Sequence, residues 1–151
     1  MTSIRRRPLV ILAALAALLL VFAERGFFGP SAVRVPEQIP AGAERLENLY
    51  RERRGGVQVE AAGVVTRLLP DDKRGSRHQR FVVELPTGQT LLIAHNIDLA
   101  PRIDGLRTGD RVEFSGEYEW NPEGGVIHWT HRDPSGKHRT GWLVHEGVKY
   151  W

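Results

Sequence analysis

Hydrophobic and polar side chains alternate along most of the chain after residue 56, which is the pattern of half-buried β-strands. The alternation is clearest in residues 111–120, where Val112, Phe114 and Tyr118 fall on one face and glutamates fall on the other. Stretches rich in glycine, proline and aspartate interrupt the alternation and are typical of turns. The pattern predicts strands at residues 57–69, 78–85, 89–94, 111–120, 126–131 and 141–145.

One segment inside this region lacks the alternation. Residues 95–106 follow the third predicted strand, and there Asp98 is expected to cap a short helical turn whose length Pro101 limits. Five main strands with a non-strand insert between the third and the fourth is the order of an OB-type barrel. We therefore predict an all-β fold, a small OB-like barrel of five to six strands over residues 57–151. A small roll or an incomplete sandwich is the alternative.

A short helix is predicted ahead of the barrel. Leu46, Leu49 and Tyr50 share one face of residues 43–54, and two glycines follow this segment. The helix is expected to cap the barrel. Residues 31–42 carry prolines and little apolar content, which is typical of a tether. Residues 31–56 are therefore predicted to be a linker and a short helix.

The first 30 residues have the pattern of a targeting segment. Arg5, Arg6 and Arg7 precede an apolar run at residues 8–23, which as a helix spans about 24 Å against a hydrocarbon thickness of ~30 Å. The run predicts a membrane anchor or, with cleavage near residue 23, a signal peptide. Both alternatives keep the arginines in the cytoplasm and place the C-terminal domain outside it.

Composition narrows the chemistry. The chain has no cysteine, which excludes disulfides, thiolate metal ligands and a cysteine nucleophile. The net charge is +3, but residues 57–151 hold 12 Lys and Arg against 13 Asp and Glu. The predicted domain is therefore nearly neutral, and nucleic acid is not an expected partner.

All six histidines lie between residues 78 and 145, close in sequence to many carboxylates. Imidazoles and carboxylates together suit zinc and other divalent transition metals. One predicted metal site consists of His95, His131, Asp133 and His138. The alternative is a set of histidines that make ordinary hydrogen bonds, with no cofactor.

A second candidate site joins the insert to the hairpin before it. His95 and Asp98 have the chemistry of a base and its orienting acid, and Arg102 can hold a phosphate or carboxylate. Alternatively, Asn96 and Asp98 cap the turn and Arg102 pairs with Asp98 or Asp104. The candidate ligand-binding residues are His78, Arg80, His95, Asn96, Asp98 and Arg102.

Two further features have a structural and a functional interpretation. Glu113, Glu117 and Glu119 form an acidic stripe, which is either a solvated face or a site for a cation or a cationic peptide. The rings of Tyr118, Trp120, Trp129 and Trp142 mostly share the apolar phase of their strands, which favours core packing over stacking on a ligand.

Several segments together resemble a family of small bacterial proteins known only as a domain of unknown function. They are LLPDD (68–72), GSRHQRF (75–81), HNIDLAPRI (95–103), GEYEWN (116–121), GGVIHWTHRDPSGKH (124–138) and GW (141–142). The resemblance implies a small exported or membrane-anchored protein, and it assigns no role to any residue. The expected location is the bacterial inner membrane, crossed once, with secretion to the periplasm as the alternative.

The sequence therefore predicts a non-catalytic binding module outside the cytoplasm. Its ligand would be a small polar molecule, an oligosaccharide or a protein, and its N-terminal helix would bind the membrane. The alternative is a metal-dependent hydrolase, such as a nuclease or phosphodiesterase, that uses the histidine and aspartate cluster. No HExxH, CxxC or G-x-S-x-G motif accompanies that cluster.

Overall fold

The computed structural model of the protein describes residues 40–151. The predicted anchor or signal at residues 1–30 and nearly all of the tether lie outside the described residues, so those predictions stay untested. No helix within residues 40–151 has the length and apolar character needed to cross a membrane.

Helix α2 spans Ala41–Arg51 and packs against the first strand. It begins two residues before the predicted start, because the Pro40 carbonyl accepts the N–H groups of Ala43 and Glu44. Its buried residues are Ala43, Leu46 and Leu49, the last two as its apolar face predicts. The Trp120 indole N–H donates to the Tyr50 carbonyl at 3.1 Å and ties the end of the helix to the domain.

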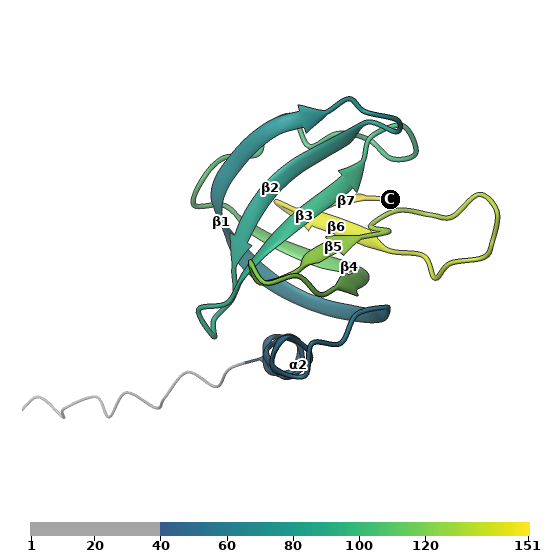
Figure 1. The fold of residues 1–151 in the computed structure, drawn as a ribbon. Helices are drawn as coiled ribbons and strands as arrows, with labels where there is room; N and C mark the ends of the chain where they lie inside the picture. Colours follow the sequence, from purple (N-terminus) through teal and green to yellow (C-terminus); the bar gives the residue numbers. More distant parts are fainter. Residues whose placement is uncertain (1–39) are drawn as a thin grey trace, which may run out of the picture. The chain divides into compact units, whose positions relative to one another are not determined.

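Seven strands form a single sheet (Figure 1). The prediction of a β-rich fold is confirmed, and most strand positions agree with the alternation. The strands are β1 (Val57–Asp72), β2 (His78–Glu84), β3 (Thr90–Asn96), β4 (Arg111–Glu119), β5 (Val126–His128), β6 (Trp142–His145) and β7 (Val148–Tyr150).

The hydrogen-bonding order is β1-β2-β3-β5-β4-β6-β7, with an additional pairing between β1 and β4. Strand β1 is 16 residues long, so its first half pairs with β4 and its second half pairs with β2. The first five strands therefore close into a ring of pairings. Strands β3 and β5 are parallel, and every other pair in the sheet is antiparallel.

The alternation decides which side chains enter the interior of the ring. Phe81, Ile93, Phe114, Tyr118 and Ile127 are fully buried and form the centre of the hydrophobic core. Burial of each such side chain contributes roughly 1.5–3 kcal/mol. The opposite phase of β4 points the acidic stripe outward, as its period-two spacing predicts.

The structure differs from the predictions at three local features. Strand β5 ends at His128, because Trp129 adopts a left-handed conformation with φ of 55° that a strand cannot continue. Strand β7 was not predicted, and it follows a tight turn at Glu146 and Gly147. The insert forms a turn at residues 97–99, in which the Ala100 N–H donates to the Asn96 carbonyl, as predicted. Asp98 does not cap this turn, because its carboxylate accepts from Arg77, and the Asn96 side chain instead accepts the Asp98 N–H.

Candidate metal centre

The hairpin of β4 and β5 places three potential metal ligands on its outer face. Glu117 lies directly opposite His128 in the antiparallel pairing, and Glu119 lies two residues further along the same strand. Residues two apart on a strand share a face, and directly opposed residues also share a face. The register alone therefore brings the two carboxylates and the imidazole together.

Their ligand atoms converge. One oxygen of each glutamate and one ring nitrogen of His128 all lie within 4.8 Å of one another. The His128 Nε2 atom is 3.8 Å from Glu117 Oε1, which is too far for a hydrogen bond. That nitrogen is buried and has no hydrogen-bond partner in the described part of the chain. Buried polar atoms are nearly always paired, and either a water molecule or a bound cation on this outer face would pair the nitrogen.

Burial also favours the ligand form of the imidazole. It lowers the pKa of His128, and the nearby Glu117 and Glu119 only partly oppose this shift. His128 is therefore neutral at physiological pH, which is the state that binds metals.

A second histidine approaches the same glutamate from the loop at residues 129–141. The His138 Nδ1 atom lies 3.9 Å from Glu117 Oε2. Its ring stacks on the indole of Trp129 with ring centres 3.6 Å apart and an interplanar angle of 12°. The two oxygens of Glu117 therefore each face a different imidazole.

Asp133 shapes this loop. Its carboxylate accepts the backbone N–H groups of Ser135, Lys137 and His138, at 2.8, 2.6 and 2.8 Å, together with the Ser135 hydroxyl. These hydrogen bonds hold the pKa of Asp133 well below its usual range, and the His138 N–H is the largest cause. The Asp133 carboxylate, which was predicted to be a metal ligand, thus accepts hydrogen bonds from the loop backbone instead.

His95 is likewise committed, inside the core. It is fully buried, with Nε2 at 3.1 Å from the Pro101 carbonyl and Nδ1 at 2.8 Å from the Thr130 hydroxyl. A carbonyl only accepts, so Nε2–H donates to Pro101 and Nδ1 accepts from Thr130. Burial lowers the pKa of His95 to about 4, which keeps the ring neutral.

His131 also bonds to the backbone. It is buried, and its Nδ1 lies 2.6 Å from the Arg132 carbonyl. Within the described residues, the ligand atoms that converge are those of Glu117, Glu119 and His128, and none belongs to the predicted set. The structure does not gather His95, His131, Asp133 and His138 into one site.

The other candidate ligand-binding residues bond mainly to neighbouring charged side chains and to the backbone. Asp98 pairs with Arg77, Asn96 accepts the Asp98 N–H, and Arg102 pairs with Asp71 and Asp104. Arg80 donates twice to the Pro70 carbonyl, and His78 Nδ1 lies 2.8 Å from the Ser76 carbonyl. The predicted alternative, in which Arg102 pairs with Asp104, is observed. The function predicted for these six residues remains untested.

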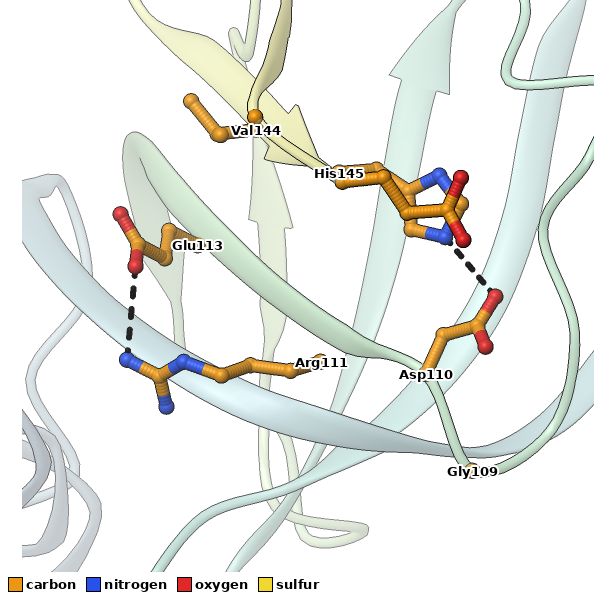
Figure 2. A pocket seen from close by; sticks show the side chains of 8 residues that line it. Gly109, Asp110, Arg111, Glu113, Val144 and His145 are labelled. Carbon is orange, nitrogen blue, oxygen red and sulfur yellow. Dashed lines mark hydrogen bonds and ion pairs between the residues drawn. The ribbon is translucent and has the colours of Figure 1, made fainter.

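A surface hollow lies at the junction of β4 and β6, with a volume of about 460 Å³ (Figure 2). His145 is 4% exposed, and its Nε2–H donates to Asp110 at 2.8 Å. The N–H of Arg107 and then His145 lower the pKa of Asp110. None of the described residues that line the hollow is serine, threonine or lysine, so these residues place no such nucleophile beside the pair. The pair fastens the start of β4 to the end of β6.

Sequence reasoning identified the glutamates of the β4–β5 cluster as a potential cation site but omitted His128. The sequence did not show how β4 and β5 align on either side of the turn at residues 121–125. This alignment places His128 directly opposite Glu117. One signal was available. His128 lies in the phase opposite to the apolar Ile127, and it therefore had to point outward like the glutamates.

The fold and this cluster define a class of protein: a small β-sheet domain that carries a glutamate and histidine cluster on its outer surface. Residues 32–151 match the family described as "Protein of unknown function (DUF3465)". The chain belongs to this family, which confirms the predicted membership of a family of unknown function. No curated protein matches the chain.

Proposed function

We propose that the protein is a non-catalytic, OB-like binding module whose ligand is a divalent transition-metal ion, with zinc the best-fitting ion. Glu117, Glu119 and His128 are the proposed ligands. The observation that carries the proposal is the convergence of their ligand atoms within 4.8 Å around a buried, unpartnered ring nitrogen.

The ligand chemistry selects the class of ion. Zinc is bound by imidazole nitrogen and carboxylate oxygen at about 2.0–2.2 Å, usually with four ligands. Calcium takes six to eight oxygen ligands, and magnesium keeps most of its water. A site with an imidazole and two carboxylates therefore favours a transition metal over either hard cation.

The OB-like description rests on strand order. An OB barrel is a partly open, five-stranded Greek-key barrel. The ring of β1-β2-β3-β5-β4 with its extra β1–β4 pairing supports that description, because the long first strand pairs with two partners. The insert between β3 and β4 takes the position of the usual OB helix.

The proposed location follows from the first 30 residues. Three arginines ahead of an apolar run favour export, with the metal-binding domain outside the cytoplasm. The domain would be anchored in the bacterial inner membrane, or free in the periplasm if the segment is cleaved. A binding module in this compartment would meet extracellular metal directly.

Calorimetric titration of the full-length chain, purified in detergent without a histidine tag, tests the proposal. We expect one zinc ion per chain and little binding of Ca²⁺ or Mg²⁺. Loss of groups that only support a ligand weakens metal binding 10–100-fold, so Glu117→Gln and His128→Gln should each weaken it at least about tenfold.

The matched control is Glu113→Gln, on the same strand and the same face as Glu117. Glu113 pairs with Arg111 at 3.4 Å and lies outside the cluster. The zinc affinity of this variant should equal that of the wild type. The proposal fails if wild-type protein binds no zinc, or if Glu113→Gln weakens binding as much as Glu117→Gln does.

A further inference from the structure

We infer that the loop at residues 129–141 closes over the bound metal and that His138 supplies its fourth ligand. The inference rests on the proposed metal site. Coordination by His138 would convert an open site with three protein ligands into a closed site with four. The conformation of the loop would then depend on whether metal is bound.

The topology brings the loop to the site. Strand β4 pairs with β6 through Ser115 and with β5 from Glu117 onward, so β5 and β6 follow the same side of β4. The chain that joins them therefore leaves and returns beside Glu117. The Gly141 N–H donates to the His131 carbonyl at 3.0 Å and closes the base of the loop. A Cβ at Gly141 would collide with the Trp129 carbonyl, so only glycine permits this close approach.

Contacts within the loop position the His138 ring. Asp133 accepts the His138 backbone N–H, and Trp129 stacks on the ring from one side. The ring nitrogens of His138 form no hydrogen bond within the described part of the chain. Its Nδ1 already lies 3.9 Å from Glu117 Oε2, and its side chain is 37% exposed. The imidazole thus lies beside Glu117 but outside the group of atoms within 4.8 Å of one another, so coordination by His138 requires the loop to shift toward Glu119 and His128.

The number of protein ligands decides what the site can do. Catalytic zinc sites hold three protein ligands and keep one position for water or substrate, whereas structural sites are closed with four. A site of Glu117, Glu119, His128 and His138 has no open position. The inference therefore favours a structural metal that holds the loop over a hydrolytic one.

Limited proteolysis with and without zinc tests loop closure, because trypsin cleaves after Arg132, Lys137 and Arg139, all in the loop and all exposed. In the full-length wild type, zinc should slow cleavage at these positions at least about tenfold. In His138→Gln, zinc should give no such protection, and its affinity should fall by at least about the same factor. The matched control is Glu113→Gln on β4, outside the cluster, which should behave as the wild type does.

Cobalt substitution reports the ligand number independently. Co²⁺ in the wild type should give the intense visible bands of tetrahedral coordination, and His138→Gln should lose that intensity. The inference is overturned if zinc binds both proteins equally, with equal protection and identical cobalt spectra. In that case the three-ligand site of the proposed function still stands. If the wild type binds no zinc, the proposed function and the inference fail together.

Discussion

His95 joins two distant parts of the chain inside the core. One ring nitrogen donates to Pro101 in the insert, and the other accepts from Thr130 just after β5. An unpaired polar group in this position would cost about 1–3 kcal/mol. We therefore propose that His95 has a structural role.

Burial of neutral His95 predicts acid sensitivity. Its pKa is about 4 in the folded state against 6.5 for the free side chain, so the unfolded chain binds more protons between these values. Stability due to this group is complete above pH 6.5 and is lost as the pH falls toward 4. Between pH 7 and pH 4.5 the wild type should lose about 2–3 kcal/mol of unfolding free energy through this group.

Urea unfolding at several pH values measures this loss. His95→Gln removes the titrating ring, so its stability should fall less over the same pH range, whatever its stability at pH 7. Equal pH dependence in the two proteins would contradict the account of His95.

The burial of His95 was available from the sequence. Leu91, Ile93 and His95 occupy one phase of β3, and the period-two alternation of a strand places all three side chains on its inner face. The same reasoning applies to His145, which follows Leu143 in the inner phase of β6. Their hydrogen-bond partners were not predictable, because these partners belong to segments without periodicity.

At the scale of single elements, the backbone conformation of the turns decides where strands begin and end, which the alternation of hydrophobic and polar residues does not show. The turn between β6 and β7 has φ of 49° at Glu146 and 78° at Gly147, the two positive values of a type I′ hairpin turn. Glycine adopts such a value without strain, whereas glutamate does not. In the pair Glu146-Gly147 only the glycine matches the Asn-Gly sequence that is typical of this turn. The sequence therefore did not predict the hairpin or strand β7.

This turn predicts a stabilising substitution. Glu146→Asn places a residue that tolerates the left-handed conformation at the first turn position, and it should raise the unfolding free energy by about 0.5–1 kcal/mol. Glu123→Asn is the control, because Glu123 is an exposed turn residue without a positive φ. Thermal and urea unfolding measure both variants. No gain in Glu146→Asn, or an equal gain in Glu123→Asn, would contradict this interpretation of the turn.

At the scale of the whole molecule, ring closure creates the candidate site. Closure requires β4 to change partner from β6 to β5, and the site lies at that change. The alternation predicted the strands and the outward acidic stripe, since both depend on local period. It could not predict the partner change or the approach of the loop, because these depend on pairings between residues far apart in sequence.

Anomalous diffraction at the zinc edge from crystals of the zinc-loaded protein tests the central claim most directly. We predict one strong peak about 2.0–2.2 Å from an oxygen of Glu117, an oxygen of Glu119 and the His128 Nε2 atom. Absence of a peak at this cluster, or a zinc ion bound instead by His95, His131 or Asp133, would contradict the account.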